Sequence, residues 1–245
     1  MSSLRFSALT LFPDMFQNLG GVVGRALKED VISLDTVYLR DFAKPPRLNV
    51  DDHPAGGGDG MVLRADICEQ ALLSILSPQS YIVHLTPTGA LFHHSWAKRL
   101  AAQSHIVFLC GRYAGFDHRF TEKYAHAHLS LGDFVLSGGE WPALCMMDAI
   151  ARQVPGVLGN QESSQHDSHA DGLLEAPAYT KPIQFAGESI PPVLQAGDHK
   201  KIAAYRRQAQ LRLTALRRPD LILAQWDHLS SAEKKFVESC WRHRS

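Results

Sequence analysis

Two glycine-containing loops have the residue types best suited to binding a ligand. They are residues 110–117 (CGRYAGFD) and residues 131–140 (LGDFVLSGGE), and each adjoins an apolar run. Glycine accepts positive φ and lets a ligand approach the backbone closely, so main-chain N–H and C=O groups can become binding groups. Either loop alone is equally compatible with an ordinary tight turn. Two such loops in one domain favour a cofactor site built from main chain.

One carboxylate is a candidate for proton transfer. Asp167 lies in the polar segment 160–171, and Arg152 ends the helix-like run before that segment. A carboxylate on a segment that becomes ordered around a substrate can act as a general base. By spacing alone, a solvated surface carboxylate is the simpler interpretation of Asp167. No nucleophile is evident, because there is no G-x-S-x-G pattern and Cys110 and Cys145 have apolar neighbours.

Metal and nucleotide motifs are missing from the sequence. The thirteen histidines include close groups at 93–94, 126–128 and 166–169, but none has the His-Glu-x-x-His pattern, so surface histidines are the better interpretation. The irregular segment 45–60 contains three consecutive glycines without the Gly-Lys-Ser/Thr of a P-loop, which argues against triphosphate binding. Four scattered cysteines, no apolar run near the ~18 residues of a membrane span and no signal-peptide core predict a cytoplasmic protein without a membrane partner.

The elements that position the loops are short apolar runs alternating with helix-like stretches. We expect strands over residues 4–11, 81–86 and 105–110, and helices over residues 66–76 and 95–102. Pro87-Thr-Gly and Gly111 are expected to stop the second and third strands. Short buried runs of this kind suit parallel strands, so the pattern indicates an α/β fold with a mainly parallel sheet. The glycine loops then follow strands at their carboxyl ends, where such sheets bind ligands.

The C-terminal part has a different composition. Residues 200–245 hold 11 Lys/Arg against 4 Asp/Glu, although the whole chain is neutral. A basic end on an acidic body favours a polyanion such as nucleic acid, with a solvated helix face as the alternative. We therefore divide the chain into a cofactor-binding domain (1–159), a flexible linker (160–171) and a small helical domain (172–245).

Two helices are expected in the helical domain. Asp198 is a plausible N-cap for a helix over residues 199–218, which Pro219 stops. Its buried face is expected to carry Ile202, Tyr205, Ala209, Leu213 and Leu216, with the arginines Arg206, Arg207, Arg212, Arg217 and Arg218 largely off it. A capping box at residues 230–233 (SSAE) opens a last helix that buries Phe236, Val237 and Cys240.

The motifs of this chain resemble those of the bacterial tRNA (guanine-N1)-methyltransferase family, TrmD. The resemblance rests first on loop 131–140 together with Gly111-Arg-Tyr. Further matching motifs run through nearly the whole chain, at residues 11–16, 50–54, 56–58, 60–61, 155–159, 171–174, 179–182 and 190–194.

The resemblance implies a specific fold and reaction. The fold is the SPOUT type, a parallel α/β sheet with a deep trefoil knot, followed by a small all-helical domain. The reaction is transfer of a methyl group from S-adenosylmethionine to N1 of the guanosine at tRNA position 37, beside the anticodon. Family members are homodimers whose active site lies at the subunit interface, and they depend on Mg²⁺.

The resemblance also implies site residues. Asp167 matches the family's general base, and Arg152 matches the arginine that contacts the target guanine. The cofactor contacts carried over are Leu85, Thr86, Pro87, Thr88, Gly89, Gly111, Arg112, Tyr113, Leu131, Gly132, Asp133, Phe134, Val135, Leu136, Ser137, Gly138, Gly139 and Pro142.

Two positions depart from the family pattern. Ala114 stands where a glutamate usually follows Gly-Arg-Tyr, which leaves the magnesium site unidentified. Residues 90–92 (ALF) are apolar where polar or basic residues are common. A catalytically weakened or inactive tRNA-binding homologue is therefore an alternative, and an enzyme that modifies another RNA within the same knotted class is a third.

Overall fold

The computed structural model describes residues 4–46, 48–159 and 167–242. It divides into two units, Met1–Gln161 and Glu162–Ser245, each with its own core. Most of the segment expected to be a linker, residues 160–166, lies outside the described residues. Within the described residues, no helix is long and apolar enough to cross a bilayer.

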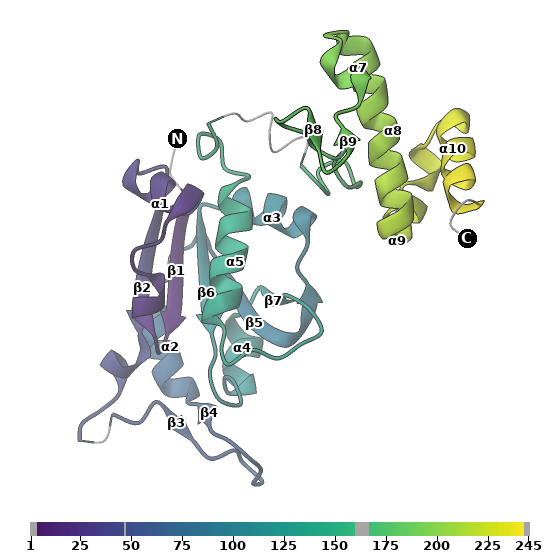
Figure 1. Ribbon diagram of the computed structural model, residues 1–245. Coiled ribbons are helices and arrows are strands. Elements are labelled where there is room, and N and C mark those ends of the chain that lie inside the picture. Colours follow the sequence, from purple (N-terminus) through teal and green to yellow (C-terminus); the bar gives the residue numbers. More distant parts are fainter. Residues whose placement is uncertain (1–3, 47, 160–166, 243–245) are drawn as a thin grey trace. The chain divides into compact units, whose positions relative to one another are not determined.

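A five-stranded sheet organises the first unit (Figure 1). Its strands are β1 (Leu4–Thr10), β2 (Ile32–Tyr38), β5 (Ser80–Leu91), β6 (His105–Cys110) and β7 (Ala127–Ser130). They run in the order β2-β1-β6-β5-β7, and every neighbouring pair is parallel. The expected α/β fold with a parallel sheet is confirmed, and β6 has the predicted bounds.

Helices cover both faces of this sheet (Figure 1). On one face lie α1 (Gly21–Lys28), α3 (His94–Ala101) and α5 (Glu140–Ala151), and on the other lie α2 (Ala65–Leu73) and α4 (His118–Tyr124). Alternate residues of β6 pack in the two cores on opposite faces of the sheet, because successive side chains of a strand point to opposite faces. Phe108 packs in the core under α5, whereas Val107 and Leu109 pack in the core under α2.

Smaller elements border the sheet. They are the 3₁₀ helices η1 (Pro13–Phe16) and η2 (Leu39–Phe42) and the paired strands β3 (Asp51–Asp52) and β4 (Val62–Leu63). Strands β2 and β7 were not expected from the sequence. β7 has only four residues, and β2 is an edge strand whose residues are largely part-exposed, so neither forms a continuous apolar run.

The expectation that Pro87 ends its strand is wrong. β5 pairs with β7 up to Leu85, shifts register, and resumes pairing at Ala90. The four residues between form a bulge, where the missing N–H of proline is tolerated. A Cβ on Gly89 would lie 2.5 Å from the carbonyl carbon of His128, so this bulge runs directly against the β7 backbone.

The second unit is built mainly from helices. It contains β8 (Gln184–Phe185), β9 (Glu188–Ser189), α7 (Pro192–Gln195), α8 (His199–Arg217), α9 (Pro219–Ala224), η3 (Trp226–His228) and α10 (Ser231–Arg242). Both predicted helix starts are confirmed. The Asp198 carboxylate accepts from Lys201 N at 3.2 Å, and Glu233 Oε2 accepts from Ser230 N at 2.8 Å.

The predicted buried face of α8 is wrong. The residues it buries are Leu211, Thr214 and Ala215, while all five residues of the expected stripe are only part-buried. The reason is tertiary, because α10 and the unexpected helix α9 both pack against α8. Pro219 ends α8 and also occupies the first position of α9, where its missing N–H costs nothing.

Candidate functional site

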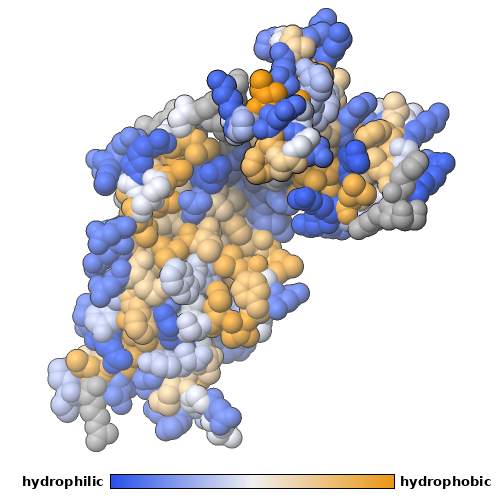
Figure 2. All heavy atoms as spheres, in the orientation of Figure 1, coloured by the Kyte–Doolittle hydropathy of each residue, from blue (hydrophilic) through white to orange (hydrophobic). Residues whose placement is uncertain are grey.

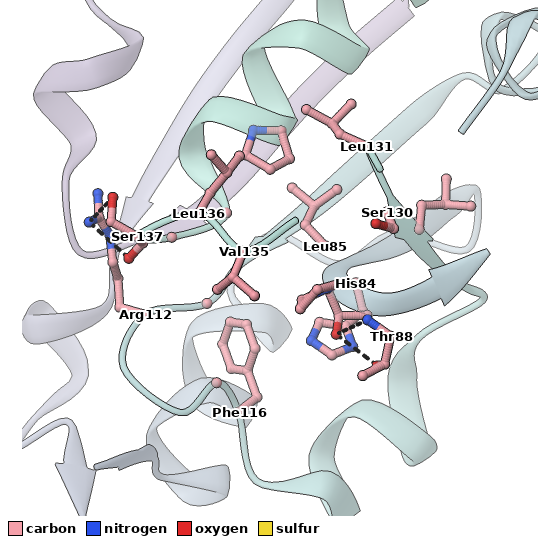
Figure 3. A pocket seen from close by; sticks show the side chains of 18 of the residues that line it. His84, Leu85, Thr88, Arg112, Phe116, Ser130, Leu131, Val135, Leu136 and Ser137 are labelled. Atoms are coloured by element: carbon pink, nitrogen blue, oxygen red, sulfur yellow. Dashed lines mark hydrogen bonds between the residues drawn. The ribbon is translucent and has the colours of Figure 1, made fainter. Parts of the chain in front are cut away.

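A cavity of about 290 Å³ opens at the carboxyl ends of β5, β6 and β7 (Figure 3). The loops that follow β6 and β7, together with residues 84–88 at the bulge of β5, form its walls. Of the cofactor contacts implied by the family resemblance, all line this cavity except Gly89, Gly132 and Asp133. Six further residues line the cavity that were not among the implied cofactor contacts, namely His84, Ala114, Gly115, Phe116, Leu129 and Ser130. Ala114, Gly115 and Phe116 belong to the glycine loop 110–117, so only the other three were not indicated by the sequence.

The three other residues lie close by. Gly89 belongs to the β5 bulge, and Asp133 is exposed at the tip of its loop. Gly132 shapes that loop, because Ser130 Oγ donates to its carbonyl at 2.9 Å and accepts from its N–H at 3.2 Å. A Cβ on Gly132 would lie 2.5 Å from the Phe134 ring, so glycine lets this ring fold back over the turn.

The cavity has an apolar interior and a polar edge. Figure 3 shows Leu85, Leu136 and Phe116 around Val135, a residue that is 80% exposed. On the β5 bulge, the hydroxyl groups of Thr86 and Thr88 form a hydrogen bond, with 2.9 Å between their oxygens. An apolar slot with few polar groups and much exposed main chain is typical of a site for a small organic ligand.

Arg112 fixes the loops that form the cavity. Its Nε lies 2.9 Å from Oε2 of the fully buried Glu140, which also accepts a hydrogen bond from Thr10 Oγ1 at 2.7 Å. Its Nη1 donates to Ser137 O at 3.1 Å, and its guanidinium lies over the Phe12 ring at 4.1 Å. Arg112 therefore lines the cavity while its guanidinium holds loop 137–139 against the end of β6.

The glycines of the second loop permit a close backbone crossing. Gly139 N donates to Gly111 O at 2.9 Å, and a Cβ on Gly139 would lie 2.6 Å from the Cα of Cys110. A Cβ on Gly138 would lie 2.3 Å from Nε of Arg112. Loop 131–139 thus leaves β7 and lands on the end of β6, two strands away in the sheet.

Two groups at or beside the cavity have shifted pKa values. Burial, with the nearby Glu140 carboxylate, raises the pKa of the Cys110 thiol, which excludes it as a nucleophile. Burial, with His128 and then His118 close by, lowers the pKa of His84 to about 4. The imidazole at the cavity wall is therefore neutral at physiological pH.

The candidate catalytic residues do not line the cavity. Arg152 caps the C-terminus of α5, and α5 begins beside the cavity at Gly139 and Glu140. Twelve helical residues span about 18 Å, so Arg152 lies at the far end of this helix. Asp167 belongs to the second unit, where its carbonyl accepts from Ala170 N at 3.1 Å. Among the residues described, no group of three or more His, Cys, Asp or Glu could hold a metal ion.

Large apolar side chains are exposed on the first unit, several of them at the cavity. Figure 2 shows hydrophobic residues gathered over the face of this unit that carries α5. The exposed residues near the cavity loops are Phe12, Tyr113, Phe134, Val135, Leu136 and Trp141. Contiguous patches of this kind mark interaction sites on soluble proteins.

Together, the fold and the cavity define an α/β protein whose loops form a cavity at the carboxyl edge of a parallel sheet, the edge where proteins of this class bind ligands. The family model described as tRNA (Guanine-1)-methyltransferase TrmD matches residues 4–224. The chain belongs to this family.

Individual relatives agree with the family match over most of their length. A tRNA (guanine-N(1)-)-methyltransferase of Magnetococcus marinus is 46% identical over 242 residues, which cover 96% of this chain and 95% of the relative. The Deinococcus deserti enzyme of the same name is 47% identical over 221 residues, 89% of this chain and 82% of the relative. That of Staphylococcus carnosus is 41% identical over 239 residues, 96% and 97% of the two chains.

Proposed function

We propose that this chain transfers a methyl group from S-adenosylmethionine to N1 of the guanosine at tRNA position 37. The observation that carries the proposal is the cavity, which gathers most of the family-matched loop positions at one edge of the sheet. Its volume of about 290 Å³ is near the lower end of the range for small-molecule sites. An apolar slot bordered by main chain fits a nucleoside, and the bound cofactor supplies a methyl group activated as a sulfonium.

Asp167 is the proposed general base. Guanine N1 carries a proton and is a poor nucleophile until that proton leaves. In the proposed step the N1–H bond breaks and its proton passes to the Asp167 carboxylate, while N1 forms the new bond to the methyl carbon. The bond from that carbon to the sulfonium sulfur would break at the same time, with its electron pair staying on sulfur, and S-adenosylhomocysteine would leave. General-base catalysis of this kind contributes roughly 10²–10⁴-fold to the rate.

Arg152 is the proposed partner of guanine O6. Deprotonation of N1 moves negative charge onto O6, and a positioned guanidinium stabilises that charge. Because α5 separates Arg152 from the cavity of its own unit, a second copy of the chain is the natural source of this residue. This separation supports a homodimer in which one subunit binds the cofactor and the other supplies Arg152.

The exposed apolar residues near the cavity support the same assembly. Val135 and Trp141 are exposed although they adjoin the candidate site. A second copy that covers them would bury apolar surface and exclude water from the reaction. We therefore propose that the dimer interface covers the cavity loops.

The second unit is proposed to bind tRNA phosphates. Arg207 pairs with Glu233 at 2.8 Å and Arg218 with Asp220 at 2.6 Å, so these two cations are neutralised internally. The exposed side chains of Arg206, Arg212 and Arg217 have no acidic partner among the residues described. These three are better placed to contact a polyanion, with an affinity that falls as salt rises.

The loop crossing supports the family's trefoil knot. Residues 131–139 leave β7 and close on β6, while β5 lies between these two strands in the sheet. We propose that this crossing is the knot. Magnesium dependence is carried over from the family without an assigned site, because the side chain of Ala114 has no oxygen to offer a cation.

A methyl-transfer assay tests the proposal. The protein is incubated with labelled S-adenosylmethionine, Mg²⁺ and matched tRNAs that have guanosine or adenosine at position 37. Label in the guanosine tRNA alone supports the proposal, and label in both or in neither contradicts it. Binding of tRNA without any label would favour the inactive homologue that Ala114 suggests. If Asp167→Asn kept near-normal methyl transfer, the general-base assignment would be wrong.

A further inference from the structure

Two histidines meet at the wall of the cavity. His84 on β5 and His128 on β7 are directly paired in the sheet, and their Nδ1 atoms lie 3.0 Å apart. Figure 3 draws the His84 ring among the apolar side chains Leu85, Val135 and Phe116. Two ring nitrogens at this distance share one proton, because two lone pairs or two N–H groups would repel each other.

A carboxylate indicates where that proton lies. Glu122 Oε1 is 3.9 Å from His128 Nε2, and it lies equally far from His118 Nδ1. The negative charge favours an N–H at His128 Nε2. A neutral imidazole has only one N–H, so His128 Nδ1 then accepts, and His84 Nδ1 donates to it.

This arrangement leaves a lone pair on His84 Nε2. The titratable and charged groups around the ring are His128 on β7 and His118 and Glu122 on α4. The His84 ring also makes a T-shaped contact with the Phe116 ring, at 5.7 Å between centroids. No residue described in the structure bonds this nitrogen, and it is not among the buried unpaired atoms, so it is open to a hydrogen-bond donor that enters the cavity.

We propose that Glu122 and His128 fix the tautomer of His84, so that its Nε2 accepts a hydrogen bond from an N–H or O–H group of the methyl-donor cofactor. This proposal rests on the proposed function. The cofactor has such donors on its adenine, its ribose and its amino-acid end. A neutral acceptor also suits this ligand electrostatically, because a protonated His84 would repel its sulfonium charge.

The tautomers can be read directly in the ligand-free protein. Nitrogen NMR of histidine-labelled protein at pH 7.5 distinguishes protonated from unprotonated ring nitrogens. We expect His84 to carry its proton on Nδ1 and His128 on Nε2. The opposite pair of tautomers, or a charged His84, would overturn the proposal. The signals of the two rings are assigned with His84→Phe and His128→Asn, because each variant lacks the signals of one histidine.

Cofactor affinity tests the acceptor role. His84→Phe keeps an aromatic ring against Phe116 and removes the nitrogen, so we expect a roughly tenfold weaker Kd for S-adenosylmethionine, the size of one hydrogen bond. The matched control is His118→Phe, because His118 is exposed and does not line the cavity. Calorimetry with 5′-methylthioadenosine, which lacks the amino-acid end, then locates the donor. If His84→Phe also weakens the binding of 5′-methylthioadenosine, the donor group lies on the nucleoside. If His84→Phe binds 5′-methylthioadenosine as well as the wild type does, the donor is the ammonium group of the amino-acid end.

A pH series tests the link through His128. In the wild type, the Kd for S-adenosylmethionine should stay nearly constant from pH 7.5 to 5.5. Burial is the main cause of the low pKa of His84 and His128 is the second, so His128→Asn should raise this pKa. The affinity of the variant should therefore fall more than that of the wild type as the pH decreases through this range. S-adenosylhomocysteine, which has no sulfonium charge, should show a smaller fall. A variant whose binding is as independent of pH as the wild type would refute the role of His128.

The two proposals fail differently. A wild-type protein that binds no S-adenosylmethionine contradicts the proposed function. A wild type that binds it, with unchanged affinity in His84→Phe, contradicts only the role of His84.

Discussion

Replacing Glu140 by glutamine should destabilise the first unit by about 3 kcal/mol. The Glu140 side chain is 0% exposed and the Arg112 side chain 16% exposed, so the variant leaves a guanidinium with little water and no counter-charge. Removing one partner of a buried ion pair costs roughly 3–5 kcal/mol. We expect the lower end of this range, because Arg112 keeps its hydrogen bond to Ser137 O. A glutamine oxygen can still accept from Thr10, so the change isolates the charge.

Urea unfolding, followed by circular dichroism at one protein concentration, measures this loss. The matched control is Asp66→Asn, since the Arg64–Asp66 pair has the same chemistry with side chains 41% and 56% exposed. Exposed pairs contribute about 0–1 kcal/mol, so the control should lose little.

A double variant separates the charge from the packing. R112M/E140M removes both charges together, so it should lose less free energy of unfolding than Glu140→Gln alone. A loss in Glu140→Gln no larger than in Asp66→Asn would refute the reasoning. It would mean that the Arg112 guanidinium is stabilised without its carboxylate partner.

Three further outcomes are expected. Gly139→Ala should abolish cofactor binding in calorimetry, because its Cβ would meet the backbone of β6, whereas Gly159→Ala, with nothing within 4 Å, should bind normally. Burial lowers the pKa of His105 below the ordinary 6.5, so the folded state binds fewer protons than the unfolded state. The free energy of unfolding should therefore fall as pH drops from 7 to 5, and less so in His105→Gln. Arg212→Ala should weaken tRNA binding and reduce the slope of log K against log salt by about one, while Arg218→Ala, which removes an internally paired cation, should change this slope less.

Local chemistry made part of the fold predictable. The run at 105–110 is apolar throughout and bounded by glycine, and it forms β6 with those bounds. The caps at Asp198 and at Ser230–Glu233 depend on residues three positions apart, so sequence alone could place them. The buried face of α8 depends on α9 and α10, and the apolar pattern of α8 favoured a different stripe.

The site divides in the same way. The glycine loops were visible because glycine marks close backbone approach, and the structure brings them into one cavity. The pair of His84 and His128 could not be predicted from the sequence, because the two residues are 44 positions apart and come together through the pairing of β5 with β7. The partner of Arg112 was hidden for the same reason, since Glu140 reads as the first residue of a helix.

Among the residues that the structure describes, those lining the cavity all belong to the first unit, and this has a consequence for how the protein would respond to a ligand bound there. A ligand that binds only the folded state adds RT ln(1 + [L]/Kd) to stability, about 2.7 kcal/mol at 100 times Kd. Ligand binding therefore raises the free energy of unfolding of the unit that contains β1–β7 and α1–α5. It does not directly stabilise the helices of the second unit. Cofactor abundance in the cell would thus set the lifetime of one half of the chain, and tRNA would set that of the other.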